Sequence, residues 1–499
     1  MKKDRKTSSP PRIHFIGIGG IGISALARWF LAKNWAVSGS DIAESEILQE
    51  LRKDGVKVKI GHKKTNLPTL PTDKPGGKQA PLSAVMVIYS AAVKPSNPEL
   101  KEARLRRMGT LSYAEAVGEL TREYRTVAIA GSHGKSTTTA FTALALQHGG
   151  IDPTVIIGTN LKEFGGGNFR CGKSQWLVLE ADEWNRSFLN YSPAVAVVTN
   201  IDNEHLDTYK NLADIKKTFL QFLARTKPGG SLVLNRDDRN LWSLRSVIRR
   251  HVSRVKYQVF WYSSNSGKDS RLIREVLKIP GAHNVSNALA AYTVATKVLG
   301  IKKSTALRAI GKYRGAWRRM ELRGYYQLPA TRYQLPVYDD YAHHPTEIKA
   351  TLKAFREKYP HPARTERARS GGSPIVCVYQ PHQAKRLQAL FKDFVRAFND
   401  ADILILLPVY EVPGRDKTTS RYTSQKLTHA IKKKYPRKAV YYLKNPKQLR
   451  RFLRRALSSP LSPNGYILNP IIVMMGAGDI VNYTPLLLSN RNLERVTTS

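Results

Sequence analysis

The chain has 499 residues, of which 41% are hydrophobic and 9% aromatic, so it can bury a packed core and is not disordered throughout. Lys and Arg number 81 against 38 Asp and Glu, and the resulting formal net charge of +43 favours anionic partners. The two cysteines, Cys171 and Cys377, exclude a disulfide framework and a four-cysteine zinc site, and they are typical of a protein of the reducing cytoplasm.

The N-terminus combines a basic segment with an apolar one. Residues 1–12 predict a flexible basic tail, and the apolar stretch that follows ends in Ala-Leu-Ala, as a signal peptide does. Four glycines within the stretch exclude that interpretation, because each weakens a helix by about 1 kcal/mol. No run of 18 uncharged apolar residues occurs, so we expect no membrane insertion.

Apolar runs alternate with helical patterns along most of the chain, which predicts an α/β protein with mainly parallel sheets. We expect strands in RIHFIGIG, WAVSGSD, AVMVIYSAAV, RTVAIA, WLVLEADE, AVAVVTNID, PVYDDYAHHP, PIVCVYQPH, ADILILLPVY and PIIVMMGAGD. Two segments rich in Pro, Gly and charge, TDKPGGKQAP and HPARTERARSGGSP, predict loop insertions. Domain boundaries near residues 120 and 325 divide the chain after its tail into residues 13–120, 121–325 and 326–499.

A first glycine loop lies between a predicted strand and a predicted helix. Its glycines match the pattern G-x-G-x-x-G and are Gly17, Gly19, Gly20 and Gly22. Asp41 follows at the end of the next predicted strand. Glycines allow the backbone to approach a pyrophosphate at a helix N-terminus. The loop is compatible with NAD, FAD or a nucleotide diphosphate sugar, and also with a tight turn that binds no ligand.

A second glycine loop has the C-terminal half of a P-loop between its own strand and helix. Its residues are Gly131, Ser132, His133, Gly134, Lys135, Ser136 and Thr137. Backbone N–H groups of such a loop hold phosphates, the lysine neutralises the β- and γ-oxygens, and the serine hydroxyl binds Mg²⁺. This half-motif predicts a nucleoside triphosphate site.

Acidic clusters follow the next two predicted strands. The first comprises Glu180, Asp182 and Glu183, and the second Glu204, His205 and Asp207. Taken alone, each cluster is also typical of a solvated strand end. Behind a phosphate loop, one carboxylate and one histidine are predicted to hold Mg²⁺.

Together these motifs resemble those of the Mur ligases of peptidoglycan synthesis. The resemblance rests on HFIGIGGIGISALA with VSGSD, GSHGKSTTT, EADE, VVTNIDNEHLDTY, PGAHNVSNALAA, RRMELRG, DDYAHHPTE, YQPH and MGAGDI, in the order of that family. It implies three α/β domains: a Rossmann-like domain for the UDP-sugar over 13–120, a central P-loop ATPase-type domain over 121–325, and a C-terminal Rossmann-like domain over 326–499.

The chain is most similar to the members of that family that join L-alanine to UDP-N-acetylmuramate. The resemblance implies that ATP phosphorylates the lactyl carboxylate of the sugar nucleotide and that the amine of L-alanine attacks the acyl phosphate. It also implies Mg²⁺, a cytoplasmic site of action and no specific nucleic-acid partner. Weak binding of polyanions is compatible with the charge, and residues 432–455 contain eleven Lys or Arg and no acid.

The resemblance also assigns roles to individual residues. Lys135, Glu180, His205, His343 and Arg319 are expected to be catalytic, and Ser136, Glu180 and His205 to bind Mg²⁺. ATP is expected to contact the second glycine loop, Asn284, Arg319 and Asp340. The UDP-sugar is expected to contact the first glycine loop, Ser40, Asp41 and Ser90, and L-alanine to contact His382 and Arg386. Asn284 is also compatible with a helix N-cap.

The sequence departs from the family pattern near the expected acceptor site. Trp184 and Asn185 replace the usual Ser and Asp after EADE, and QAK follows the histidine of YQPH without the usual aromatic residue. These departures keep open a sister ligase that acts in muropeptide recycling or uses another first amino acid. A basic ATPase that binds polyanions is a further alternative, whereas an NAD-dependent dehydrogenase leaves the second glycine loop unexplained.

Overall fold

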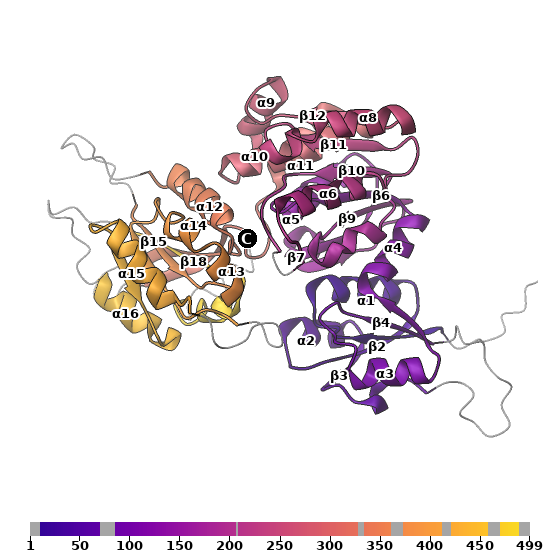
Figure 1. Cartoon of the computed structure of the whole chain (residues 1–499), viewed down its shortest axis with the longest axis horizontal. Coiled ribbons are helices and arrows are strands. Elements are labelled where there is room, and N and C mark those ends of the chain that lie inside the picture. The colour runs from indigo at the N-terminus through magenta and orange to yellow at the C-terminus, as the bar shows by residue number, and fades with distance from the viewer. Residues whose placement is uncertain are drawn as a thin grey trace, which may run out of the picture. The chain divides into compact units, whose positions relative to one another are not determined.

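The computed structural model describes residues 10–69, 85–205, 208–327, 334–360, 373–411, 421–457 and 470–488, and only the backbone of residues 253–255. In this part the chain forms three β-sheets with helices on both faces, which confirms the α/β class (Figure 1). The chain divides into two compact units, Met1–Val276 with Val285–Tyr313 and Leu277–Asn284 with Arg314–Ser499. Two sheets lie in the first unit and one in the second.

The first sheet has five parallel strands in the order β3-β2-β1-β4-β5. Its strands are β1 (Arg12–Ile16), β2 (Ala36–Asp41), β3 (Lys57–Ile60), β4 (Val85–Tyr89) and β5 (Gly109–Ser112). Its helices are α1 (Ile21–Ala32), α2 (Glu46–Lys53), α3 (Pro98–Leu105) and α4 (Tyr113–Glu123). Helices α1, α2 and α4 share an apolar core with β1, and α3 shares another with β4, which explains why the inner strands are apolar on both faces.

The second sheet has seven strands in the order β12-β11-β10-β6-β9-β7-β8, parallel except for the pair β7 and β8. Its strands are β6 (Arg125–Ala130), β7 (Thr154–Leu161), β8 (Gly167–Arg170), β9 (Trp176–Glu180), β10 (Val195–Val198), β11 (Ser231–Asn235) and β12 (Gln258–Tyr262). Its helices are α5 (Lys135–His148), α6 (Leu212–Leu223), α7 (Arg239–Trp242), α8 (Arg245–Val255), α9 (Lys268–Val276), α10 (Ala282–Thr293) and α11 (Lys303–Lys312).

The third sheet has six strands in the order β13-β14-β18-β15-β16-β17, parallel except for the pair β13 and β14. Its strands are β13 (Glu321–Gln327), β14 (Gln334–Asp340), β15 (Ile375–Tyr379), β16 (Ile403–Leu406), β17 (Ala439–Tyr442) and β18 (Ile471–Met475). Its helices are α12 (Pro345–Lys358), α13 (Ala384–Ala389), α14 (Phe391–Val395), α15 (Ser424–Lys434) and α16 (Leu449–Ala456).

Strand order brings the chemically interesting loops together. Strand β6 lies between β10 and β9, and the three run parallel. The second glycine loop follows β6, and the two acidic clusters follow β9 and β10. Because carboxyl ends of parallel strands meet at one edge of a sheet, these three segments share that edge. In the same way, β1 between β2 and β4 places the first glycine loop beside Asp41 and Ser90.

The first two sheets are joined by a polar contact as well as by a common apolar core. Asn168 on β8 is fully buried, and its amide donates to the carbonyl of Ile21 and to Ser24 Oγ at the start of α1. Arg28 on α1 donates to the side-chain oxygen of Asn168. A buried amide that satisfies both of its donors in this way fixes α1 against the second sheet.

Each apolar run that the sequence analysis assigned to a strand contains one in the structure, so these predictions are confirmed. Of the predicted tail, residues 1–9 lie outside the described part, and Arg12 already belongs to β1 because it pairs with Ala36 on β2. The predicted domain boundaries stay predictions, and residues 120 and 325 lie within α4 and β13.

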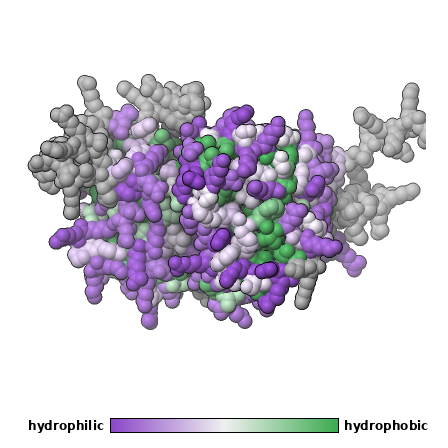
Figure 2. All heavy atoms as spheres, turned by 90° about the horizontal axis from the view of Figure 1, so that it is seen from above, coloured by the Kyte–Doolittle hydropathy of each residue, from purple (hydrophilic) through white to green (hydrophobic). Residues whose placement is uncertain are grey.

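Both predicted loop insertions fall almost entirely outside the described residues. TDKPGGKQAP lies wholly outside them, and HPARTERARSGGSP does so up to residue 372. Within the described residues, no helix combines the length and the apolar character needed to cross a bilayer. On the face drawn in Figure 2, hydrophilic residues cover most of the described surface and apolar ones form smaller areas.

Candidate active site

The second glycine loop joins β6 to α5 in a conformation that only glycine accommodates well. Gly131 has a φ of +139° and Gly134, at the N-terminus of α5, a φ of +82°. A Cβ atom on Gly131 would lie 2.0 Å from Thr199 Oγ1, and one on Gly134 would lie 2.3 Å from Asn287 Oδ1. Glycine at these two positions therefore lets the loop pass close to Thr199 and Asn287 at the N-terminus of α5, the end of a helix that favours phosphate groups.

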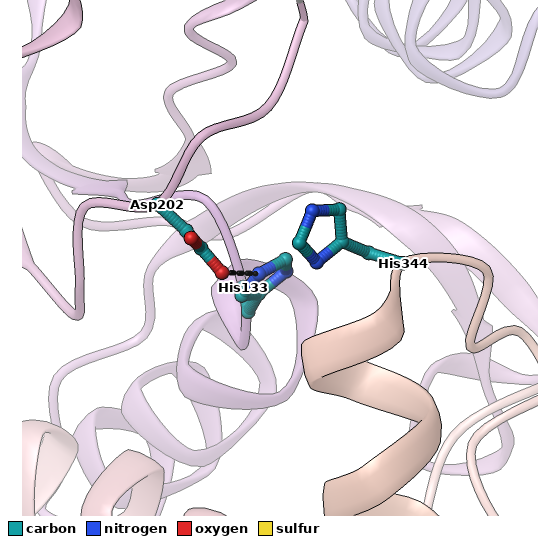
Figure 3. A group of neighbouring side chains, drawn as sticks. All are labelled: His133, Asp202 and His344. Atoms are coloured by element: carbon teal, nitrogen blue, oxygen red, sulfur yellow. Dashed lines mark hydrogen bonds and ion pairs between the residues drawn. The ribbon is translucent and has the colours of Figure 1, made fainter. Parts of the chain in front are cut away.

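Residues that follow β10 hold this loop in place. Asn200 accepts the N–H of His133 through its side chain (2.8 Å), and Thr199 Oγ1 donates to the carbonyl of His133 (2.7 Å). The side chain of Ser132 accepts the N–H of Asp202 (2.8 Å). The ring of His133 is directed toward the carboxylate of Asp202, 3.1 Å away (Figure 3). The sequence analysis gave no role to Thr199, Asn200 or Asp202, although all three belong to the motif VVTNID.

Lys135 lies at the centre of this arrangement. Its Nζ donates to the carbonyl of Gly131 (2.7 Å) and to the Glu183 carboxylate (2.9 Å). Burial alone would lower the pKa of Lys135, but Glu183, Asp182 and Glu204 outweigh it and raise the pKa above its usual range. The lysine is therefore a fixed cation beside the loop.

A carboxylate and histidine cluster lies next to the lysine. Ligand atoms of Asp182, Glu183 and His205 lie within 4.8 Å of one another, and His205 Nε2 is 3.3 Å from Glu183. Burial would lower the pKa of His205, but the hydrogen bond with Glu183 and nearby carboxylates raise it. The two carboxylates of this cluster offer the oxygen ligands that Mg²⁺ takes in proteins.

Two further residues, Glu180 and Ser136, were also predicted to bind magnesium. Glu180, at the end of β9, accepts the N–H of Gly158 (2.7 Å) and is not part of that three-residue group. Ser136 lies in the first turn of α5 and is buried. Asp207, in the second acidic cluster of the sequence, lies outside the described residues.

The first glycine loop is held by the ends of β2 and β4. The N–H of Gly17 donates to the carbonyl of Ser40 (2.8 Å), and the N–H of Gly19 to the Asp41 carboxylate (2.8 Å). A Cβ on Gly17 would lie 3.0 Å from that of Ser90, and one on Gly22 would lie 2.8 Å from Tyr113 Oη. Gly20 caps α1, so the residues expected at the UDP-sugar meet at one helix N-terminus.

A buried carboxylate, Glu99 on α3, supports this loop and was missed by the sequence analysis. It accepts hydrogen bonds from His14 Nε2 (3.0 Å) and Ser40 Oγ (2.7 Å), and the ring of His62 lies 3.6 Å away. Burial would raise the pKa of Glu99, but hydrogen bonds from His14, His62 and Ser40 outweigh it and keep the pKa far below the usual range. In the sequence, asparagine, proline and glutamate in succession indicate only the start of a helix, and they do not indicate that the glutamate is buried.

The second unit contains the remaining predicted residues. Arg319 lies over the ring of Tyr341, with 5.0 Å between guanidinium carbon and ring centroid. Both oxygens of the buried Asp340 are engaged, by the N–H groups of Met320 (2.8 Å) and Ala342 (2.9 Å). Asn284 is the third residue of α10 and donates to the Pro280 carbonyl (2.7 Å), so it is not the N-cap.

A histidine group lies at the carboxyl ends of β14 and β15. The rings of His343 and His382 are 5.9 Å apart, and His382 is stacked on Tyr410 at 5.5 Å. Arg386 Nη1 lies 3.3 Å from His382 Nδ1. His344 caps α12 by accepting the N–H of Thr346. The structure therefore brings His343, His382 and Arg386 together and adds Tyr410, to which the sequence analysis gave no role.

Comparisons with known proteins match three family models along the chain: the Mur ligase catalytic domain at residues 12–125, the Mur ligase middle domain at 129–295 and the glutamate ligase domain at 318–478. The UDP-N-acetylmuramate–L-alanine ligase of Aquifex aeolicus is 35% identical, and the match covers 97% of this chain and 98% of that protein. The chain belongs to the Mur ligase family.

Further Mur ligases show the same relation. The UDP-N-acetylmuramate–L-alanine ligase of Geobacter sp. (strain M21) is 36% identical, over 94% of this chain and 95% of that protein. The crystal structure of UDP-N-acetylmuramate–alanine ligase from Thermotoga maritima has a TM-score of 0.70 at 25% identity and covers 98% of this chain and 99% of that one. A murein peptide ligase from Psychrobacter arcticus shares the fold, with a TM-score of 0.62 at 20% identity and coverage of 95% and 98%.

Proposed function

We propose that this Mur ligase uses ATP to join L-alanine to UDP-N-acetylmuramate. The observation that carries the proposal is the partly buried Lys135, which lies on a phosphate loop beside a carboxylate and histidine cluster. The full-length similarity to ligases of that substrate pair agrees with it. The alternative is a sister ligase, and the observation that favours it is the replacement of the usual Ser and Asp by Trp184 and Asn185. Asn185 also has a left-handed backbone, with a φ of 52°.

In the proposed reaction the γ-phosphoryl group of ATP is transferred to the lactyl carboxylate of the sugar nucleotide. Lys135 stabilises the negative charge on the transferring phosphoryl oxygens, and N–H groups of the loop bind the β-phosphate. The amine of L-alanine then attacks the acyl carbon, phosphate leaves with the C–O bond electrons, and the amine loses a proton to solvent or to a base. We assign ATP contacts also to Asn284, Arg319, Asp340 and His343.

A magnesium ion fits the donor set at the strand ends of the second sheet. We propose that Ser136, Glu180 and His205 hold it, with Asp182 and Glu183 as neighbouring carboxylates. When bound, the ion neutralises charge on the phosphate oxygens. Lys135 Nζ lies 2.9 Å from the Glu183 carboxylate, so these acids lie directly beside the phosphate loop.

The two other substrates are assigned to the loops that the structure brings together. We propose that the UDP-sugar binds at the first glycine loop with Ser40, Asp41 and Ser90, because these residues meet the loop at the N-terminus of α1, where a helix favours anionic groups. For L-alanine we propose His382 and Arg386, since a fixed cation can hold its carboxylate. We place the reaction in the cytoplasm, which suits the unpaired thiols of the chain.

The deciding experiment measures phosphate release from ATP with Mg²⁺, UDP-N-acetylmuramate and single amino acids. Release that requires both the sugar nucleotide and L-alanine is the expected result. Release with glycine, serine or a peptide in place of L-alanine would assign a sister reaction. Lys135→Ala should abolish release, whereas Lys217→Ala, which removes an exposed lysine of α6, should leave it intact. No sugar-dependent release by the parent protein would overturn the proposal.

A further inference from the structure

One edge of the third sheet carries a dense set of cations. The edge consists of α15 on one face of the sheet, strand β17, and α16 on the other face. Between residues 432 and 455 ten Lys and Arg side chains are exposed and no acid occurs. We call these ten side chains the basic edge: Lys432, Lys433, Lys434, Arg437, Lys444, Lys447, Arg450, Arg451, Arg454 and Arg455.

The arginines in the first turn of α16 and the repeated like-charged pairs do not stabilise the helix. Arg450 and Arg454, like Arg451 and Arg455, are four residues apart, and such like-charged pairs destabilise a helix by about 0.2–0.5 kcal/mol each. The first turn of α16 contains no acid, so two arginines lie at the positive end of the helix dipole. Helix α2 also has bases in its last turn, but its first turn contains the acid Glu46. An anionic ligand would relieve the repulsion in α16.

The basic edge is continuous across β17 and includes aromatic rings. Tyr441 on β17 is 40% exposed, and its ring centroid lies 5.2 Å from that of Phe452 on α16. The Nζ atom of Lys432 on α15 lies 6.0 Å from the centroid of the Tyr441 ring. Strand β17 itself, with the sequence AVYY, contributes no charge. Cations that flank an exposed aromatic ring are suited to a chain of phosphates joined to stacking bases.

An anionic membrane is a less suitable partner for the basic edge than a nucleic acid, because the apolar face of α16 is already buried. Leu449 and Leu453 are 2% and 0% exposed, because they pack into the core beneath the sheet. A helix that inserts into a lipid surface needs an apolar face that is free for the acyl region. The part of α16 left for a partner consists of arginines together with the half-buried Phe452.

We propose that the basic edge binds the phosphate backbone of single-stranded nucleic acid without sequence preference. This binding is additional to ligase activity and does not depend on it, since no residue of the basic edge has a role in the proposed reaction. Lys and Arg release counterions from the phosphates, and the exposed ring of Tyr441 stacks on a base. Association is therefore expected to weaken steeply as salt is added.

The test compares two variants that lower the net charge equally. In the first, Arg450, Arg451 and Arg454 are replaced by glutamine. In the matched control, three arginines of α8 whose side chains are described and exposed are replaced in the same way: Arg245, Arg249 and Arg250. Fluorescence anisotropy with a labelled single-stranded RNA of about 20 nucleotides gives Kd across a range of salt concentrations. The loss of three phosphate contacts should lower the slope of log Kd against log salt by about 2 and weaken binding about fiftyfold at 0.15 M salt.

The control variant is expected to bind within about threefold of the parent protein. A triple Arg→Lys variant at 450, 451 and 454 keeps the charge and should restore most of the affinity. Equal weakening by the glutamine variant and its α8 control would mean that binding is spread over the whole surface, and this would overturn the proposal. The same conclusion follows if the parent protein fails to bind RNA at 0.15 M salt, or if the glutamine variant loses binding only to phosphatidylglycerol vesicles.

Thermal unfolding separates this effect from misfolding. Because the substitutions remove like-charged neighbours on α16, the glutamine variant should unfold at the same temperature as the parent protein or at a higher one. A parallel loss of RNA binding and of the unfolding transition would assign the effect to folding and would count against the basic edge as a binding surface.

Discussion

Substitution of Glu99 by glutamine tests how the first glycine loop is supported. Glu99 Oε1 accepts from the N–H of Lys63 (3.0 Å) and from Asn66 Nδ2 (2.6 Å). Oε2 accepts from His14 Nε2 (3.0 Å) and from Ser40 Oγ (2.7 Å). Glutamine keeps the shape but replaces one acceptor oxygen by an NH₂ group, so one of these two pairs of donors would face another donor.

The expected loss follows from these contacts. A hydrogen bond to a charged group contributes about 1.5–3 kcal/mol, and two are lost with the oxygen. Part of the loss is recovered when the hydroxyl of Ser40 and the ring of His14 turn their lone pairs toward the new NH₂ group. We therefore expect Glu99→Gln to lower the free energy of unfolding by about 2–5 kcal/mol at pH 7, and the midpoint temperature by roughly 4–20 °C.

Helix α3 provides a matched control. Glu102 lies on the same helix and pairs with Arg106 at 2.8 Å, but both side chains are partly exposed. Such surface pairs contribute about 0–1 kcal/mol, so Glu102→Gln should have little effect. Calorimetry on both variants and on the parent protein separates the buried from the exposed carboxylate.

The pH dependence gives a second readout. Because the pKa of Glu99 is depressed in the fold, its contribution is complete above the pKa of the unfolded chain, about 4.3. The contribution is lost as the pH falls below that value. The difference between the parent protein and Glu99→Gln should therefore shrink on acidification. A difference below about 0.5 kcal/mol at pH 7, or one independent of pH, would refute the argument.

Three further predictions concern the other parts of the molecule. Lys135→Ala should abolish ATP-dependent turnover but leave binding of the UDP-sugar, measured by calorimetry, within a few-fold of the parent. Gly134→Ala places a Cβ 2.3 Å from Asn287 Oδ1 at a φ of +82°, so we expect ATP affinity to fall at least tenfold in an equilibrium binding assay. Asp339 is buried, which raises its pKa to about 6, so its ionisation costs stability as the pH rises from about 4 through 6. Asp339→Asn should therefore raise the free energy of unfolding at pH 7 by about 1–3 kcal/mol and leave it nearly unchanged at pH 4, as followed by urea denaturation.

Local patterns account for the parts of the site that the sequence analysis found. Gly131, Gly134 and Lys135 could be identified because a phosphate loop needs positive φ angles and a cation at fixed spacing within one short segment. The apolar runs were identified for a similar reason. Strands covered by helices on both faces are continuously apolar, and this signal does not depend on the rest of the chain.

Contacts between distant segments could not be derived in this way. In the sequence, Glu183 is one of three acids at a strand end. Only the strand order β10-β6-β9 brings it into contact with Lys135 and His205. Glu99 is separated by 59 residues from Ser40, the residue that it holds. Nothing in the residues around a helix cap indicates that a carboxylate will be buried with two histidines.

The sequence by itself therefore determined the α/β class, the strands, both glycine loops and the family, because each depends on residues that are neighbours along the chain. The tertiary structure decided which acids meet the lysine, which carboxylate supports the first loop, and that α15 and α16 bring their cations to one sheet edge. Parallel strands that are neighbours in a sheet come from distant parts of the sequence, so the partners at their ends are set by strand order.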